Sequence, residues 1–302
     1  MSGKVMSMAE AVRRFVADGD TVYAAGFTHA VPYAAGHEII RQRKRNLILC
    51  RATPDLMYDQ LIAAGCARKL VFSWAGNASV GLLRAVRRGV ESGSLEVEEY
   101  THYGMTARLF AGAAGLPFYP LRSNTGSDLV RVNPNIKTVT CPYTGETLST
   151  VPALNPDVAI IHVQRADAEG NAQLWGIFGE QREAAFAARR VILAVEEIVD
   201  ERVIRSDPNR TVIPGFVVSA VVEEPWGAHP SFLQGYYDRD NEFYIQWDKI
   251  SSSDESLHAY LEEWVFGVAD RREYVRKLGA EKVVALTPKR YYSVPVDYGL
   301  YV

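Results

Sequence analysis

The sequence predicts an α/β fold with an open, mostly parallel sheet and helices on both of its faces. Short apolar segments alternate regularly with amphipathic helical segments from residue 8 to residue 121. Residues 157–163, Asp-Val-Ala-Ile-Ile-His-Val, form an apolar run that is typical of a buried strand. Because strands that alternate with helices are joined by right-handed crossovers, this pattern favours parallel pairing.

Local end signals define the elements up to residue 121. Ser7 and Glu10 form a capping-box pattern at the start of the first helix. Gly26 allows a sharp turn after a strand rich in Thr, Val and Tyr. Pro54 suits the first turn of a later helix, and Gly65 ends that helix. The expected helices are 8–17, 33–42, 54–64, 80–89 and 104–114, and the expected strands are 21–25, 46–50, 70–73, 95–98 and 117–121.

The pattern changes after residue 121. Polar residues, Gly and Pro over 122–135 predict a long loop, and Thr144-Gly145 predicts a hairpin within 138–150. Asp270 is the expected cap of a late helix. The later expected strands are 157–163, 191–195 and 216–222, and the later helices are 180–188, 256–266 and 271–278. The tyrosine-rich residues 288–302 predict an extended C-terminal arm on a single domain that spans residues 1–302.

Composition excludes several classes of protein. The net charge of −3 provides no basic field for nucleic acid, and the hydrophobic content of 48% is ordinary for a globular chain. No apolar run is long enough to cross a membrane, and the N-terminus carries no signal pattern. Cys50, Cys66 and Cys141 are widely spaced, so no disulfide framework or zinc site is expected. These features favour a cytoplasmic protein.

The common nucleotide and metal motifs are absent. The sequence contains no GxGxxG, GxxxxGK[ST], GxSxG or HExxH pattern, so no metal and no permanently bound cofactor is expected. The candidate functional residues lie instead in loops at predicted strand ends, where open α/β sheets bind their ligands.

The first two candidate loops follow the strands at 21–25 and 70–73. The backbone amides of Gly26 and Phe27 are candidate donors to an acyl oxygen or phosphate, although an ordinary strand-to-helix corner explains the same residues. Ser73 and Asn77 offer neutral donors beside the apolar wall of Trp74, which suits a carboxylate or thioester carbonyl. A turn with a packed Trp is the alternative.

Three further loops add titratable or flexible residues. Glu99 and His102 are a candidate acid/base pair, or else part of the solvated face of an edge strand. Arg122 is able to fork onto a carboxylate or phosphate, and Gly126 allows close backbone approach, although Asx-turns also explain this loop. His229 is the only titratable group in the loop 227–231.

Taken in order, these segments resemble the A (α) subunit of family I coenzyme A transferases, and in particular the glutaconate CoA-transferase branch. The resemblance extends over residues 8–270. The segments that carry it are Asp18-Gly19, Gly26-Phe27, Pro32, Glu38-Ile-Ile-Arg41, Ala64-Gly65, Lys69-Leu-Val, Gly115-Leu-Pro-Phe118, Asp167-Ala-Glu-Gly-Asn171 and Gly227-Ala-His-Pro-Ser231. The sequence departs from the family pattern at Ala25, which replaces a glycine, and in the shortened turn 29–32.

The resemblance implies a CoA-transferase that moves CoA between an acyl-CoA and a carboxylic acid. Such an enzyme pairs an A with a B (β) subunit, in a heterotetramer or larger, with the active site between them. A glutamate of the B subunit forms an acyl anhydride and then a glutamyl-CoA thioester. This chain has no glutamate that matches the nucleophile, so it is expected to shape the acyl pocket with its loops at Phe27, 73–77, His102 and 122–128, and to be inactive alone.

Two alternatives remain open at this stage. The chain also resembles one component of the hydrolases that cleave carbon–carbon bonds in steroid-derived CoA thioesters, which implies an acidic residue where His102 stands. In that case His102 or Glu99 is the candidate base. The second alternative is a non-catalytic ligand-binding domain on the same scaffold.

Overall fold

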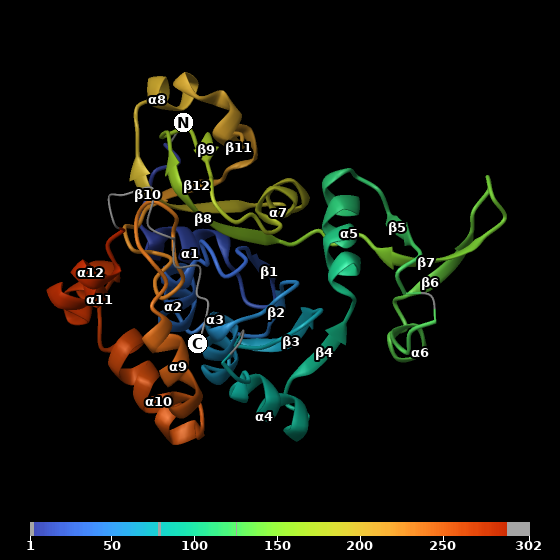
Figure 1. The fold of residues 1–302 in the computed structure, drawn as a ribbon, viewed down its shortest axis with the longest axis horizontal. Helices are drawn as coiled ribbons and strands as arrows, with labels where there is room; N and C mark the ends of the chain where they lie inside the picture. Colours follow the sequence, from blue (N-terminus) through green and yellow to red (C-terminus); the bar gives the residue numbers. More distant parts are fainter. Residues whose placement is uncertain (1–2, 78–79, 125, 289–302) are drawn as a thin grey trace.

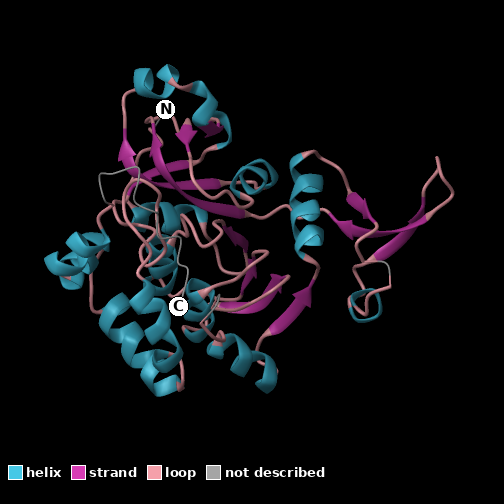
Figure 2. Cartoon of the chain, viewed as in Figure 1, coloured by secondary structure: helices cyan, strands magenta, loops and turns pink. Residues whose placement is uncertain are grey.

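A nine-stranded sheet runs through the centre of the described part of the molecule (Figures 1 and 2). The computed structural model describes residues 3–77, 80–124 and 126–288. Strands β12, β10, β8, β1, β2, β3 and β4 lie side by side in that order and pair in parallel, while the short β9 and β11 pair antiparallel beside β8. Their bounds are β1 Thr21–Ala24, β2 Leu47–Cys50, β3 Ala67–Phe72, β4 Glu96–Glu99, β8 Val158–Ala166, β9 Ala172–Gln173, β10 Val191–Ile198, β11 Thr211–Ile213 and β12 Ala220–Glu223.

Helices cover both faces of this sheet (Figure 1). The side chains of β8 alternate between two cores: Val158 and Ile160 pack on one side, and Ala159 and Ile161 on the other. The helices are α1 Met8–Phe15, α2 Tyr33–Arg41, α3 Leu56–Ala63, α4 Arg84–Ser92, α5 His102–Ala113, α6 Leu129–Val132, α7 Gln181–Ala187, α8 Glu201–Ser206, α9 Asn241–Ile250, α10 Asp254–Leu261, α11 Arg271–Leu278 and α12 Ala280–Leu286. The predicted α/β fold is therefore confirmed. Within the described ranges, no helix is long and apolar enough to cross a bilayer.

A small antiparallel sheet projects beyond α5 (Figure 1). It consists of β5 (Phe118–Leu121), β7 (Thr147–Pro152) and β6 (Lys137–Thr140), in that spatial order. The hairpin expected within 138–150 is thus present, but the strand expected at 117–121 belongs to this sheet rather than to the central one. Its antiparallel pairing with β7, in which Tyr119 lies opposite Val151, holds it there, and Pro120, which has no N–H to donate, is suited to this edge strand.

Several predicted bounds differ from the structure. The helix expected at 80–89 begins only at Arg84, and the strand expected at 216–222 begins at Ala220 because Gly215–Val217 forms a 3₁₀ turn. The sequence patterns do not predict helices α6, α8, α9 and α12, and α6 interrupts the long loop expected at 122–135. Of the predicted arm at 288–302, only Pro288 lies within the described residues, so the arm and the single-domain organisation remain predictions.

The topology places the ends of the parallel strands together. Because these strands run in the same direction, their carboxyl ends all lie at one edge of the sheet. Strand β1 pairs with β2 on one side and with β8 on the other, so the chain order switches direction there. Such switch points open a crevice at the carboxyl edge, and the loop that begins at Gly26 lies at this one.

Candidate functional site

Four loops meet at the carboxyl edge of β1, β2, β3 and β4. They begin at Gly26 after β1, Arg51 after β2, Ser73 after β3 and Tyr100 after β4. The edge is lined with partly exposed aromatic rings, since Phe27 is 39%, Trp74 44% and Tyr103 53% exposed. This edge of the sheet, which we call the reaction edge, therefore offers apolar walls around a small number of polar groups.

The loop after β1 has a backbone conformation that requires glycine. Gly26 has φ 128°, and a Cβ there would lie 2.9 Å from the carbonyl oxygen of His29. Thr28 and Ala30 both have φ 55°, which is uncommon for residues with a side chain and concentrates at functional loops. The loop thus holds a strained shape that presents Phe27 to the solvent.

The segment 175–180 locks this loop in place. The Nδ1 of His29 lies 2.8 Å from the carbonyl oxygen of Ile177, and the backbone N–H of Gln234 donates to Nε2 at 3.2 Å. Because the backbone N–H must donate, Nε2 is the acceptor and Nδ1 carries the proton. Burial lowers the pKa of His29 to about 4, so the ring is neutral near pH 7. His29 therefore acts as a structural link between two loops.

Ser73, His102 and Thr53 form a hydrogen-bonded chain at the reaction edge. Thr101 caps α5, which makes the exposed His102 the first residue of that helix. Its Nδ1 lies 2.9 Å from Ser73 Oγ and its Nε2 lies 3.0 Å from Thr53 Oγ1. The two hydroxyls come from the ends of β3 and β2, so the imidazole bridges neighbouring loops.

The donors expected from Ser73 and Asn77 point into the protein. The hydroxyl of Ser73 donates to the carbonyl oxygen of Ala52 at 2.5 Å. Asn77 is buried, and its side-chain amide donates to the carbonyl oxygen of Tyr244 at 2.7 Å. Both groups secure the loop, so the sequence-based expectation of two free neutral donors is corrected here.

The two glutamates at the end of β4 have different environments. Glu99 is exposed, and its carbonyl oxygen accepts a hydrogen bond from the side chain of Asn133 at 2.8 Å. Glu98 is half-buried and ion-paired with Lys69 at 2.6 Å and Arg108 at 3.5 Å. Burial is the largest single influence and opposes the charge of Glu98, but the hydrogen bonds from Lys69 and Tyr100 and the charges of Arg108 and Lys69 together outweigh it, so the pKa of Glu98 lies below its usual value. No hydrogen bond or ion pair among the described residues joins Glu99 to His102.

A carboxylate that the sequence patterns do not single out lies beside the β1 loop. Glu180 accepts a hydrogen bond from the buried phenol of Tyr23 at 3.0 Å and a long one from Thr106 at 3.4 Å. The preceding residue, Gly179, packs against Phe27, since a Cβ on Gly179 would lie 3.0 Å from that side chain. None of the ion pairs among the described residues involves Glu180. It is therefore a carboxylate held by hydroxyl groups alone.

Three candidate residues lie elsewhere. The guanidinium of Arg122 donates two hydrogen bonds to the carboxylate of Glu146 in the small sheet, from Nε at 2.9 Å and from Nη2 at 2.7 Å. Gly126 lies in the exposed loop that follows Arg122. His229 is fully buried, with its ring nitrogens 3.0 Å from Tyr274 Oη and 3.2 Å from Asp240 Oδ2. Burial lowers the pKa of His229 to about 4. These partners leave His229 no face for a ligand, so its role in this structure is packing.

The site residues that sequence patterns miss carry only weak local signals. Thr53 stands at a strand end next to Pro54, and Glu180 reads as an ordinary first residue of a helix. Only the contacts with His102 and Tyr23 distinguish them. No group of three or more His, Cys, Asp or Glu side chains in the described part of the chain could hold a metal ion.

The comparison with known families bears on the fold and the family of this chain. The family model described as Coenzyme A transferase matches residues 5–224. The chain belongs to the coenzyme A transferase family. This match confirms the family resemblance, and the relatives below place this CoA-transferase chain among the A subunits.

Two relatives of this CoA-transferase chain are similar over almost their full length. It is 51% identical over 282 residues to the A subunit of the 3-oxoadipate CoA-transferase of Pseudomonas knackmussii, which covers 92% of this chain and 99% of the relative. It is 36% identical over 301 residues to the A subunit of the glutaconate CoA-transferase of Acidaminococcus fermentans, with 94% of each chain covered. An A subunit implies a partner, the B subunit.

Structural similarity supports the same family. The crystal structure of the Acidaminococcus fermentans glutaconate coenzyme A-transferase superposes with a TM-score of 0.91 at 35% identity, covering 95% of this chain and 96% of that one. One component of a cholesterol ring-cleaving hydrolase of Mycobacterium tuberculosis is also similar, at 28% identity over 93% of this chain. Both enzyme types that the sequence suggests therefore occur among the relatives of this CoA-transferase.

Proposed function

We propose that this chain is the A subunit of a heteromeric enzyme that moves CoA between an acyl-CoA and a carboxylic acid. The observation that carries the proposal is the similarity over nearly the full length to the A subunit of a 3-oxoadipate CoA-transferase. The names of the relatives favour a dicarboxylic acid, such as 3-oxoadipate or glutaconate, as one substrate.

In the proposed reaction, a glutamate of the B subunit is the nucleophile. Its carboxylate attacks the acyl carbonyl, the CoA thiolate leaves, and an acyl anhydride forms. The thiolate then attacks the glutamyl carbonyl, which releases the first acid and leaves a glutamyl-CoA thioester. The acceptor carboxylate reverses these steps and departs as the new acyl-CoA.

The role of this chain is to bind the acyl group and exclude water. An anhydride is hydrolysed readily, so the site must be closed while it exists. Phe27, Trp74 and Tyr103 supply exposed apolar surface around the reaction edge, and the B subunit is proposed to close over them. His102 and Ser73, which lie 2.9 Å apart at this edge, remain proposed site residues.

The test is reconstitution with a B subunit of a CoA-transferase from the same organism. Purified alone, the chain is expected to give no CoA exchange between succinyl-CoA and 3-oxoadipate or glutaconate. Together the two chains are expected to catalyse exchange and to form a hydroxylamine-sensitive adduct. Mass spectrometry should place that adduct on the B subunit. An adduct on this chain, for example at Glu180, would refute the division of roles.

The same assay separates transfer from hydrolysis. Water-dependent product formation without an acceptor acid would favour the hydrolase alternative, in which His102 or Glu99 acts as the base. That specific mechanism would then require activity to fall in His102→Ala or Glu99→Gln. Tight acyl-CoA binding with neither reaction would instead support a ligand-binding role.

A further inference from the structure

A pocket lies among the four C-terminal helices α9 to α12, on the side of the molecule away from the projecting sheet (Figure 1). Its volume is about 350 Å³, which is within the range of pockets that hold ligands. Aromatic rings form much of its wall, with Phe243 from α9, Tyr260 from α10, Trp264 from the segment after α10, and Tyr274 from α11. No residue of the reaction edge lines this pocket, so it is a separate site.

The backbone at Trp264 has an unusual conformation. Residues Glu262–Phe266 form a π-helix, a turn that is rare in proteins and is found frequently at functional sites. The Trp264 ring centroid lies 5.5 Å from that of Tyr274 and 4.9 Å from Lys277 Nζ, and the side chain stays only half-buried. The described chain thus presents an aromatic surface to this pocket and leaves part of it exposed.

The charged groups at the pocket neutralise one another. Lys282 Nζ lies 3.1 Å from Asp240 Oδ1 and 2.7 Å from Glu242 Oε2, and Lys277 Nζ lies 3.1 Å from Glu263 Oε1. Each of the two lysines that line the pocket is therefore paired with a carboxylate. Such a site suits uncharged aromatic side chains better than a phosphate or a carboxylate.

The chain leaves the described residues beside this pocket. The carbonyl oxygen of Leu286, the last residue of α12, accepts a hydrogen bond from the backbone N–H of Asp238 at 2.8 Å, two residues before Asp240 of the pocket wall. The 14 residues 289–302 follow. Fully extended, they span up to about 50 Å, whereas α9 is about 15 Å long. The segment is therefore long enough to return across the pocket.

The composition of that segment matches the pocket. Residues 291–302 contain four tyrosines, three valines and one leucine, with a single charged side chain, Asp297. Lys289 and Arg290 precede them, and the carboxylates of Glu242 and Glu263 beside the pocket belong to side chains that are 66% and 59% exposed. A short tether also keeps the segment at an effective concentration of the order of millimolar.

We propose that residues 289–302 dock in the pocket among α9 to α12, with tyrosine side chains against Phe243 and Trp264. The docked segment fastens the C-terminal helices to one another, so the C-terminal arm that the sequence predicts lies on its own domain. This inference goes beyond the proposed function and does not depend on it.

The test is photo-cross-linking in the full chain, with and without a B subunit. p-Benzoylphenylalanine replaces Tyr291, Tyr292, Tyr298 or Tyr301, one position at a time, and mass spectrometry maps the links after irradiation. We expect at least one position to link to residues that line the pocket in the same chain. Mixing with an isotope-labelled copy distinguishes links within a chain from links between copies. Links only to a B subunit, to a second copy or to another face of this chain, or no links from any position, would overturn the proposal.

Two variants of α9 test the pocket itself. Gln246 is exposed and lines the pocket, so Gln246→Trp fills it and should abolish these cross-links. The same change should speed trypsin cleavage after Lys289 and Arg290 by about tenfold or more, because a protease cuts the released segment in proportion to its population. Ile245→Trp is the matched control, since Ile245 is 58% exposed and does not line the pocket, and it should change neither result.

Urea denaturation shows whether both variants remain folded. Equal cleavage rates in two folded variants, or cross-links that persist in Gln246→Trp, would refute docking in this pocket. If Gln246→Trp does not fold, the cross-links of the otherwise unaltered chain decide the question alone.

Discussion

At the scale of single residues, Tyr23 illustrates how a buried group prepares the reaction edge. It is fully buried in β1, and its phenol donates to Glu180 at 3.0 Å. Burial, and then the nearby charge of Glu180, raise the pKa of Tyr23 well above its usual value. Tyr23 therefore keeps its proton at any physiological pH and serves as a permanent donor to that carboxylate.

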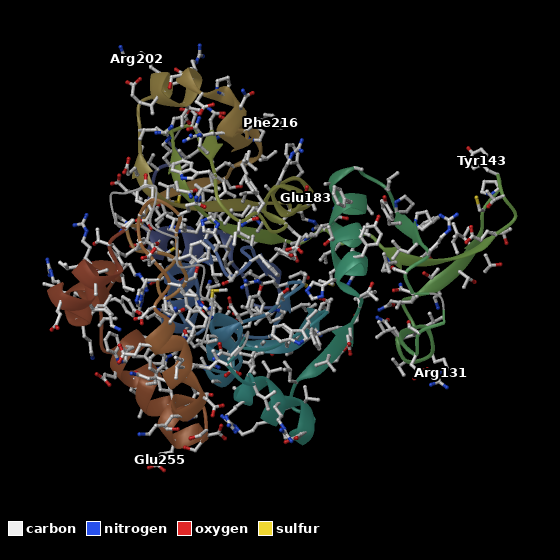
Figure 3. The ribbon with its side chains drawn as sticks, viewed as in Figure 1. Arg131, Tyr143, Glu183, Arg202, Phe216 and Glu255 are labelled. Atoms are coloured by element: carbon white, nitrogen blue, oxygen red, sulfur yellow. The ribbon has the colours of Figure 1, made fainter. Side chains whose placement is uncertain are left out.

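Tyr23→Phe tests this contact. The change removes the donor and leaves the carboxylate of Glu180 without its inner partner. We expect the free energy of unfolding, measured by urea denaturation, to fall by about 0.5–1.5 kcal/mol. Tyr143→Phe is the control, since Tyr143 is 94% exposed at the tip of the projecting sheet (Figure 3), and should have no effect. Equal stability of Tyr23→Phe and the unaltered protein would contradict the assigned contact.

His29 makes stability depend on pH. Its pKa is lowered to about 4 by burial, against about 6.5 in an unfolded chain. The unfolded state therefore takes up this proton first as the pH falls. The contribution of the neutral His29 to the free energy of unfolding is fully present above about pH 6.5 and is lost as the pH falls from there through 4. About 2 kcal/mol of this free energy is lost between pH 6.5 and 5.

His29→Asn removes this titration while keeping a side-chain donor for the carbonyl of Ile177. We expect the variant to be less stable at pH 7, because the N–H of Gln234 loses its acceptor. The loss of stability between pH 7 and pH 5, followed by urea denaturation, should be smaller by about 2 kcal/mol than in the unaltered protein. Parallel pH profiles for the two proteins would exclude His29 as the titrating group.

The sequence identifies the positions at the reaction edge better than it identifies their hydrogen-bond directions. Strand-end positions predict Ser73 and His102 as site residues, and both lie at this edge. The proton of Ser73, however, points to the carbonyl oxygen of Ala52, and Glu180 arrives from a loop far along the chain. Such directions depend on tertiary neighbours, which local patterns do not reveal.

At the scale of elements, α9 shows where local propensity is insufficient. Its sequence, Asn-Glu-Phe-Tyr-Ile-Gln-Trp-Asp-Lys-Ile, carries aromatic and β-branched residues that favour helix only weakly. Tertiary contacts stabilise it instead. Trp247 is fully buried and donates from Nε1 to Asp59 on α3 at 3.0 Å, and Asn77 donates to the carbonyl oxygen of Tyr244. Local sequence patterns are also insufficient to place β5 in its sheet, because its partner strand β7 begins far downstream in the sequence.

Trp247→Ala is expected to cost about 3–5 kcal/mol of unfolding free energy, because it empties a large buried site. Arg84→Ala provides the contrast at another contact of α9, the one with α4. It removes only the pair with Asp248 on α9, whose two side chains are 38% and 44% exposed, and should cost no more than about 1 kcal/mol. Urea denaturation of both variants measures the difference. Similar costs for the two would contradict the view that Trp247 anchors α9.

At the scale of the whole molecule, exposed aromatic rings gather around one edge of the sheet. Phe27, Trp74 and Tyr103 follow the carboxyl ends of β1, β3 and β4, and Phe178, which is 53% exposed, lies in the segment that contacts the loop of Phe27. Gathered apolar surface of this kind marks interaction sites in soluble proteins. It is consistent with a B subunit that covers the reaction edge.

Phe178→Asp tests that arrangement. A charge in a covered apolar contact should weaken association with the B subunit by about tenfold or more, as measured by analytical ultracentrifugation of the mixed chains. Tyr143→Asp, on the distal tip of the small sheet, is the matched control and should associate normally. If only the Tyr143 variant loses the partner, the interface lies on the projecting sheet instead.

The link between the loop at 26–30 and the segment at 175–180 also bears on how the molecule is made. Tyr23 and Glu180 are 157 residues apart in sequence, and His29 and Ile177 are 148 apart. During synthesis, the strands β1 to β4 leave the ribosome long before the segment that locks the first loop. Contacts at such separation form slowly and late. The reaction edge is therefore completed only when most of the chain has been translated, so a partner that covers this edge would select chains that have finished folding.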